Sequence, residues 1–300
     1  METLENIQIN FDPSQLKILN ICLGILMFGV AIDIKLADFK IVLTDYKPVI
    51  AGIVSQWIWL PLMTLGLIWL IKPAPSIALG MALVASCPGG NVSNFAVHLS
   101  KANTALSILL TMISTLFCSI TTPLIFINLN KFLPIELVDR TLFDISFLSM
   151  FETIVTLLFI PLVLGLLTKK YFPTFIAKIV KPVRFLSIGI FITFIIGAVY
   201  GNFDSLRAYI GIVFWIVLLH NGLSLLLGYT WARYFVKLKK NDSRTISIET
   251  GIQNSGLGLI LIFNFFGGSG GMALIAAWWG IWHLISAFVL AMWWRKKTNV

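Results

Sequence analysis

Residues 245–266 read TISIETGIQNSGLGLILIFNFF, an apolar run interrupted near its middle by a carboxylate, an amide pair and three glycines. A second apolar run contains SCPGGNVSN at residues 86–94. Pro88 removes a backbone donor and clashes with the preceding helical turn, and the glycines beside it loosen the backbone. In hydrocarbon each unpaired backbone group costs several kcal/mol, so such stretches are tolerated only where protein or a water-filled cavity surrounds them. The two runs therefore predict two helices that are broken inside a membrane.

The composition of the whole chain agrees with a membrane protein. Hydrophobic residues make up 58% of the 300 residues and charged residues only 12%, whereas soluble domains carry roughly 25% charged residues. Soluble, disordered, collagen-like and coiled-coil proteins are excluded on these numbers. A membrane β-barrel would show short alternating strands instead of long apolar runs. We expect an all-α polytopic membrane protein.

Nine segments are long and apolar enough to cross a bilayer, for which about 20 residues are needed. Their connections are short, so we expect one membrane domain over residues 1–300. The predicted transmembrane helices are 16–34, 48–71, 76–98, 103–127, 146–167, 184–201, 208–232, 245–266 and 270–294.

The basic residues predict the orientation of these spans. With the N-terminus outside, 17 of the 22 lysines and arginines fall in cytoplasmic connections or the C-terminal segment, as the positive-inside rule requires. The sequence therefore predicts a multi-pass protein of the plasma (inner) membrane with a cytoplasmic C-terminus. The net charge of +9 then reflects membrane orientation, and we expect no nucleic-acid partner. The basic residues left outside are Lys17, Lys72, Lys131, Arg140 and Arg207.

The two interrupted segments, the third and the eighth, are five crossings apart, so they run in opposite directions through the membrane. Interrupted helices in corresponding places of two inverted repeats mark the binding site of secondary transporters. The halves hold four and five spans, so the first repeat would lack one helix. The alternative is two ordinary kinked helices, because Gly and Pro are common in membrane helices.

Glu249 in the eighth segment is the carboxylate most in need of a partner. Its span carries no lysine or arginine to neutralise it, and intramembrane carboxylates usually mark ion or proton paths. Ser107, Thr111 and Ser114 share one face of the fourth segment. Neutral oxygens with one carboxylate suit a weakly held monovalent cation, since Mg²⁺ and Ca²⁺ recruit more carboxylates. We infer Na⁺ with H⁺ as the competitor; the alternative is a protonated glutamate bonded to backbone.

At these residues the chain resembles the bile acid:sodium symporter family. The resemblance runs from Gln56 to His283 in the family's order. The motifs that carry it are CPGGNVSN (87–94), NTALSILLTMIST (103–115), LHNG (219–222), IETGIQNSGL (248–257) and WH (282–283).

The resemblance implies a panel domain, a core domain, and two broken helices that cross in the core. It also implies two sodium sites behind the crossing and a substrate anion at the tips of the broken helices. The first sodium site would be formed by Ser93, Asn94, Ser107, Thr111 and Glu249. The second would be formed by Gln56, Glu249 and Gln253 with backbone carbonyls near Thr250 and Ile252, and substrate would meet Asn91, Asn254 and His283.

These inferences together predict a sodium-coupled symporter that imports an organic anion, either bile-acid-like or a small carboxylate. Relatives often carry Thr where Asn91 stands and Asn where Leu284 stands, so the substrate-facing positions differ from the pattern more than the cation positions do. The alternatives are a proton-coupled or uncoupled carrier of the same fold, a channel, and an enzyme using Ser255 or His283. We expect no enzymatic activity, membrane lipid as the surroundings, and no obligatory protein partner.

Overall fold

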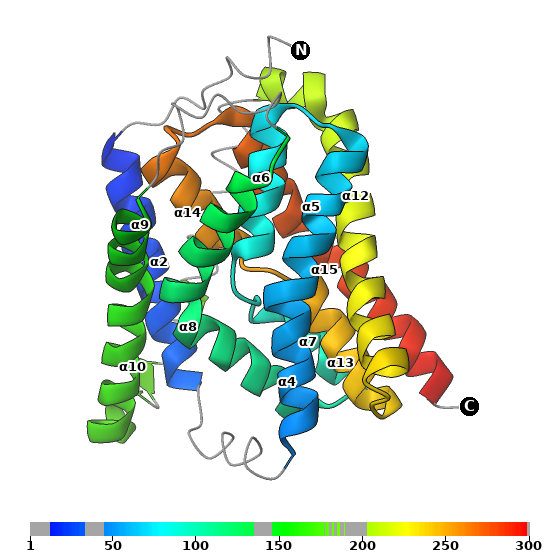
Figure 1. The fold of residues 1–300 in the computed structure, drawn as a ribbon. Helices are drawn as coiled ribbons and strands as arrows, with labels where there is room; N and C mark the ends of the chain where they lie inside the picture. Colours follow the sequence, from blue (N-terminus) through cyan, green and yellow to red (C-terminus); the bar gives the residue numbers. More distant parts are fainter. Residues whose placement is uncertain are drawn as a thin grey trace.

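The computed structural model of the protein describes residues 13–33, 45–134, 146–176 and 203–298, with a few positions between 178 and 189. Within these residues every regular element is a helix, and extended backbone pairs only in an isolated bridge between Gly89 and Gln253 (Figure 1). The helices are α2 (Pro13–Asp33), α4 (Tyr46–Val54), α5 (Leu60–Ile71), α6 (Pro75–Ser86), α7 (Val92–Leu99), α8 (Thr104–Lys131), α9 (Phe147–Ile154), α10 (Ile160–Tyr171), α12 (Phe203–Thr230), α13 (Lys240–Gly251), α14 (Ser255–Phe265) and α15 (Gly270–Thr298).

Five of the described helices are long and apolar enough to cross a membrane. They are Tyr46–Ile71, Thr104–Lys131, Phe147–Tyr171, Gly211–Phe235 and Gly270–Lys296, which overlap the predicted spans 48–71, 103–127, 146–167, 208–232 and 270–294.

The remaining predicted spans correspond to shorter or undescribed stretches of chain. Helix α2 covers most of the predicted span 16–34, and two helix pairs, α6 with α7 and α13 with α14, cover the two interrupted segments. The predicted span 184–201 lies almost entirely outside the described residues. The count of nine spans therefore stays a prediction.

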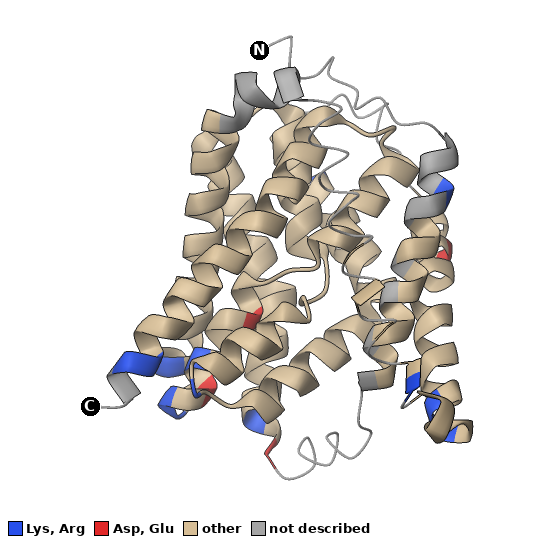
Figure 2. Ribbon diagram, turned by 180° about the vertical axis from the view of Figure 1, so that it is seen from behind, with Lys and Arg blue, Asp and Glu red and all other residues tan. Residues whose placement is uncertain are grey.

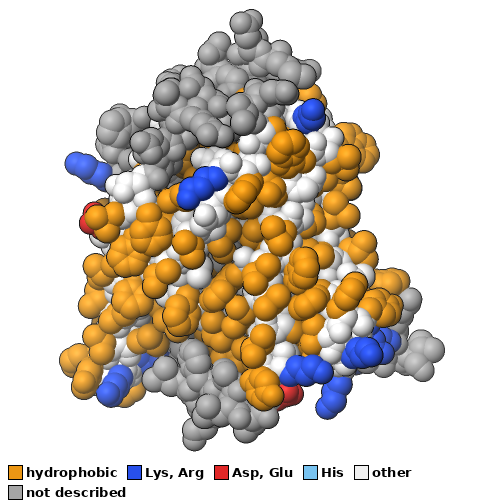
Figure 3. Space-filling model, viewed as in Figure 1, with side chains coloured by type: hydrophobic (Ala, Val, Ile, Leu, Met, Phe, Trp, Pro, Cys, Tyr) orange, Lys and Arg blue, Asp and Glu red, His pale blue; other side chains and the backbone are white. Residues whose placement is uncertain are grey.

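The surface has the layout of a membrane protein. Hydrophobic side chains form a broad band over the face seen in Figure 3, and charged residues lie toward its two ends. Most of the described lysines and arginines gather at the end of the molecule where α15 finishes (Figure 2). Helix α2 begins at the opposite end (Figure 1).

Two of the spanning helices contain a π-helical turn just before a proline. The turn Ser55–Trp59 joins α4 to α5 ahead of Pro61, and the turn Val155–Phe159 joins α9 to α10 ahead of Pro161. Proline offers no N–H and its ring clashes with the carbonyl four residues earlier, and a wider turn relieves both problems. Gln56 lies in the first of these turns, so Pro61 influences the local backbone of a predicted site residue.

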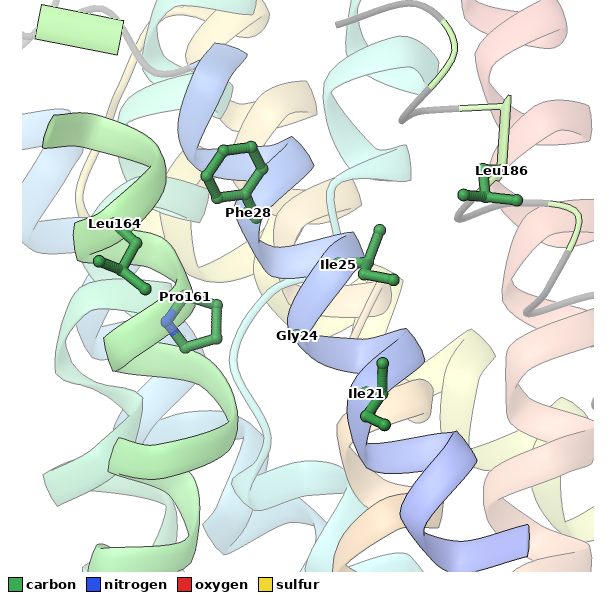
Figure 4. A pocket seen from close by; sticks show the side chains of 7 residues that line it. All are labelled: Ile21, Gly24, Ile25, Phe28, Pro161, Leu164 and Leu186. Atoms are coloured by element: carbon green, nitrogen blue, oxygen red, sulfur yellow. The ribbon is translucent and has the colours of Figure 1, made fainter. Parts of the chain in front are cut away.

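Helices α2, α9 and α10 stand together on one side of the molecule (Figure 1). An open groove of about 470 Å³ lies between α2 and α10 (Figure 4). All of its lining residues are apolar or glycine, so it offers no ligand for an ion and no donor for an anion. The lining residues are Ile21, Gly24, Ile25, Phe28, Pro161, Leu164 and Leu186.

The first broken half of the eighth segment begins five residues earlier than predicted, at Lys240 instead of residue 245. The prediction excluded the charged residues that precede the apolar run. In the structure Asp242 is buried, and its Oδ1 accepts a hydrogen bond from Asn103 Nδ2 at 2.7 Å. The Asn103 backbone N–H also donates to Thr245 Oγ1 at 3.0 Å. Asn103, which precedes α8, thus supplies the hydrogen-bond partners that allow these polar residues to extend α13.

Candidate ion and substrate site

The two predicted breaks are real and lie against each other. Helix α6 ends at Ser86 and α7 begins at Val92, while α13 ends at Gly251 and α14 begins at Ser255. Backbone N–H groups donate in both directions across the gap, from Gly90 to the Ile252 carbonyl at 3.1 Å and from Asn254 to the Pro88 carbonyl at 2.8 Å. Each break therefore satisfies backbone groups that the other leaves unpaired, which explains how extended chain is tolerated here.

The Glu249 side chain is fully buried beside this crossing. Its Oε1 accepts hydrogen bonds from Ser93 Oγ at 2.5 Å and from Ser107 Oγ. Thr111 Oγ1 lies 3.1 Å from Oε2, and Gln56 Nε2 lies 3.5 Å from the same oxygen. Every one of these partners is a neutral group. Among the described residues no lysine or arginine is bonded to this carboxylate.

Asn94 completes the cluster around the carboxylate. Its Oδ1 lies 2.8 Å from Ser107 Oγ and 3.5 Å from Thr111 Oγ1, while the hydroxyls of Ser93 and Thr111 are 3.3 Å apart. The structure thus brings together all the residues predicted for the first sodium site. They come from three elements, α7, α8 and α13, of which α7 and α13 are halves of different broken helices.

The residues predicted for the second sodium site also lie together. Gln56 Nε2 donates to the Glu249 carbonyl at 3.0 Å, and Gln253 Nε2 donates to the Thr250 carbonyl at 3.0 Å. Both glutamines are buried, and within the described structure neither side-chain Oε1 has a hydrogen-bond partner. Buried polar atoms are normally paired, so these two amide oxygens are available to a cation. The Ile252 carbonyl already accepts from the Gly90 N–H.

Two further residues of this region were not predicted as site residues. Ser114 accepts from the Gly89 backbone N–H at 3.2 Å, and Ser55 is hydrogen-bonded to Thr250 Oγ1 at 2.7 Å. Ser114 belongs to the polar face already visible in the fourth segment, and Ser55 directly precedes Gln56. Both make hydrogen bonds at the crossing, and among the described hydrogen bonds neither reaches the carboxylate.

The three residues predicted to meet substrate are less closely associated. Asn91 is exposed at the start of α7 without capping it, whereas Asn254 caps α14 by accepting from the Leu257 N–H at 3.1 Å. His283 is buried on α15 with an unpaired Nδ1. Among the described residues no hydrogen bond joins the three. His283 lies one turn beyond Gly280, where an added Cβ would stand 2.7 Å from Ser255 Oγ at the start of α14.

The atoms at the crossing that could bind a metal ion are oxygens of hydroxyls, amides and carbonyls around one carboxylate. No group of three or more His, Cys, Asp or Glu side chains that could hold a metal occurs in the described part of the chain. Such a donor set is unsuited to zinc and poor in charge for Ca²⁺ or Mg²⁺. A helical membrane protein with two broken helices that meet at such an oxygen cluster has the architecture of a secondary transporter.

Sequence comparison identifies the family. The model of the Sodium Bile acid symporter family matches residues 20–208. The chain belongs to this family. The match includes the first break and the hydroxyl-bearing helix α8 and ends before the second break.

Named relatives extend the similarity over the second break. The chain is 35% identical over 281 residues to the "Uncharacterized sodium-dependent transporter YocS" of Bacillus subtilis, covering 94% of this chain and 84% of that protein. It is 31% identical over 246 residues to the "Probable sodium/metabolite cotransporter BASS2, chloroplastic" of rice, covering 81% of this chain and 56% of the rice protein. The family and these relatives are transporters, not enzymes.

Proposed function

We propose that this protein is a sodium-coupled symporter that imports an organic anion, either bile-acid-like or a small carboxylate. The observation that carries the proposal is the buried Glu249 carboxylate, whose described partners are all neutral oxygen- and nitrogen-bearing groups. A buried charge is costly unless it is paired. A bound Na⁺ would supply the missing positive charge in a pocket lined with the oxygen ligands it prefers.

The proposal assigns two sodium sites that share Glu249. Ser93, Asn94, Ser107 and Thr111 would complete the first, and the distances of 2.8–3.5 Å between their side-chain oxygens support this grouping. The side-chain oxygens of Gln56 and Gln253, with backbone carbonyls of Thr250 and Ile252, would complete the second. The unpaired Oε1 atoms of both glutamines support this assignment.

The substrate anion would bind where the second halves of the broken helices begin. Helices α7 and α14 both start at the crossing, and helix N-termini carry partial positive charge that favours anions. We assign Asn91, Asn254 and His283 to this site. Relatives named as sodium/metabolite cotransporters support a small organic substrate.

The proposed topology has nine spans in two inverted repeats, the first lacking one helix, within a single membrane domain. Helices α2, α9 and α10 would belong to the panel domain and the broken helices to the core domain. The protein would lie in the plasma membrane, with its N-terminus outside the cell and its C-terminus in the cytoplasm. The gathering of basic residues at the end where α15 finishes supports this orientation (Figure 2).

Coupling requires that Na⁺ bind one conformation better than the other. The first site takes ligands from halves of both broken helices, so an ion there would hold the crossing together. The second site would hold the Gln56-bearing π turn against the same crossing. Sodium would thereby stabilise the arrangement in which both helix N-termini face a common substrate.

The test uses the purified protein in proteoliposomes and in detergent. A thermal-shift screen against organic anions, with NaCl or choline chloride, identifies a ligand that stabilises the protein only with sodium. Uptake of that ligand is then measured against external Na⁺ at fixed pH. We expect saturable, sodium-dependent uptake, which Glu249→Gln abolishes while the variant still inserts.

Glu152→Gln is the matched control, because Glu152 is an exposed carboxylate within another apolar helix. It should transport like the wild type. Uptake that continues unchanged in choline would refute sodium coupling, and uptake that follows the pH gradient instead would favour the proton-coupled alternative.

A further inference from the structure

Asn221 is a fully buried amide on α12 with no role in the two sodium sites. Its Nδ2 donates to the Gly251 carbonyl at 2.7 Å, and its Oδ1 accepts from Ser286 Oγ at 2.6 Å. Gly251 is the last residue of α13, and Ser286 lies on α15. One side chain thus connects three helices at the point where the second broken helix stops.

The carbonyl groups at the end of α13 show why this contact matters. The last carbonyls of a helix have no partner within the helix, and inside a membrane each unpaired one costs several kcal/mol. The Ile248 carbonyl accepts from the Ile252 N–H at 3.0 Å. Side-chain amides serve the next three, with Gln56 on Glu249, Gln253 on Thr250 and Asn221 on Gly251.

Two of these three amides, Gln56 and Gln253, are the ones assigned to the second sodium site. Asn221 is the third member of the set and the one whose own oxygen is already bonded. Asn221 lies 32 residues before Gln253, and Gln56 lies 33 residues before Gly89. The helix that precedes each broken helix therefore carries an amide at a similar position, and both amides bond to the end of α13. The end of α13 carries Glu249 two residues before Gly251.

Helices α12 and α13 are closely packed next to this helix end. An added Cβ on Gly251 would stand 2.4 Å from Leu225, and one on Gly228 would stand 2.8 Å from the Ile246 carbonyl oxygen. Ser247 Oγ donates to the Leu225 carbonyl at 2.6 Å. Helices α12 and α13 are therefore closely packed, and the Asn221–Ser286 hydrogen bond joins this pair to α15 at the end of α13.

The link to α15 ends at a predicted substrate residue. Ser286 Oγ is 3.2 Å from the His283 carbonyl and 2.6 Å from Asn221 Oδ1. A hydroxyl has one proton to donate, and the shorter contact assigns it to Asn221. The turn of α15 that presents His283 is thus tied through Ser286 and Asn221 to the helix end that carries Glu249.

We propose that Asn221 is a positioning residue for ion coupling, which holds the end of α13 in its sodium-binding geometry and ties it through Ser286 to the His283-bearing turn of α15. The inference rests on the proposed function. A positioning role predicts weaker sodium binding when the tie is cut, whereas a purely structural role predicts lower stability with unchanged sodium binding.

The experiment uses Na⁺ alone as the probe. The thermal midpoint of the purified full-length protein is measured over a range of NaCl at constant ionic strength with choline chloride, for the wild type and for Asn221→Asp, Ser286→Ala and Ser286→Thr. Asn221→Asp keeps the acceptor for Ser286 and replaces the donor to Gly251 with an oxygen. We expect it to raise the half-maximal sodium concentration about tenfold, and Ser286→Ala to raise it about threefold to fivefold, as expected for one lost hydrogen bond in each variant. Ser286→Thr keeps the hydroxyl and should stay within about twofold of the wild type.

Ser224→Ala is the matched control on α12. The Ser224 hydroxyl donates to the His220 carbonyl of its own helix at 2.7 Å, and none of the described hydrogen bonds joins it to α13 or α15. Its half-maximal sodium concentration should equal that of the wild type. If Asn221→Asp does not fold, the difference in half-maximal sodium concentration between Ser286→Ala and Ser286→Thr tests the positioning role.

The outcomes separate the inference from the function on which it rests. A wild type without any sodium-dependent stabilisation overturns the proposed sodium sites and this inference with them. A wild type that responds to sodium, with Asn221→Asp and Ser286→Ala less stable in choline but unchanged in half-maximal sodium concentration, overturns the positioning role alone.

Discussion

Thr111→Val removes one hydroxyl from the centre of the proposed first sodium site with almost no change of shape. The Thr111 hydroxyl lies 3.1 Å and 3.3 Å from the two Glu249 oxygens and 3.3 Å from Ser93 Oγ. Hydroxyl-to-oxygen hydrogen bonds are usually 2.7–2.8 Å long. A hydroxyl that donates its proton keeps its oxygen lone pairs, so the Thr111 oxygen can act as an ion ligand.

The expected size of the effect follows from the lost interaction. A single contact of a polar group with a charge contributes about 1.5–3 kcal/mol, which corresponds to an increase of about tenfold to a hundredfold in the half-maximal sodium concentration. The side chain is 2% exposed, so water cannot readily replace the missing oxygen. The protein without sodium should be somewhat less stable than the wild type, because the buried Glu249 carboxylate loses a hydrogen-bond donor. The half-maximal sodium concentration therefore serves as the readout.

The assay is sodium-dependent thermal stabilisation followed by ²²Na⁺ binding to the purified protein. Thr115→Val is the control, since Thr115 is also buried, lies one turn along α8, and donates its hydroxyl proton to the Thr111 carbonyl at 2.7 Å. Its half-maximal sodium concentration should stay within about twofold of the wild type. Equal responses of the two variants would refute the placement of sodium beside Thr111.

Three further substitutions probe the same region. In Gly89→Ala the new Cβ would lie 3.3 Å from the Glu249 carboxylate, so ²²Na⁺ binding should weaken severalfold, and unchanged binding would show that the ion lies elsewhere. Gln253→Met keeps the length of the side chain but removes its unpaired oxygen, so the sodium titration of uptake should lose cooperativity; a wild-type Hill coefficient would contradict a second site there. In Gly228→Ala the Cβ would lie 2.8 Å from a carbonyl oxygen of α13, which should cost about 1–3 kcal/mol and lower the thermal midpoint. Gly222→Ala, where an added Cβ has nothing within 4 Å, should keep or slightly raise that midpoint, and a similar loss in both would exclude close packing as the cause.

Much of the architecture could be predicted because hydrophobicity and backbone chemistry are local properties. The apolar runs predicted membrane helices, and five of them are described as long apolar helices. Pro88 with its neighbouring glycines, and the polar stretch around Gly251, marked the breaks at the residues where the helices end. The π turns escaped prediction, although Pro61 and Pro161 were visible, because a proline can also be accommodated by a simple kink.

The assembly of the site depends on long-range contacts that spacing alone does not reveal. Ser107, Thr111 and Ser114 share a helix face by their spacing, but only the fold brings that face to Glu249, 142 residues after Ser107. The family resemblance supplied the grouping in advance. The resemblance included Asn221 in the LHNG motif but gave it no role, and its partners lie 30 and 65 residues further along the chain.

The amino-acid sequence alone predicted the class of protein, the positions of most helices and the two helix breaks. Each of these features depends on a stretch of neighbouring residues. Only the tertiary structure shows how the ends of the broken helices pair and which side-chain amide donates to which carbonyl. The physical reason is that a helix end inside a membrane must find its hydrogen-bond partners in other helices. Those partners, Gln56 and Asn221 for the end of α13, are brought there by packing between segments far apart in sequence.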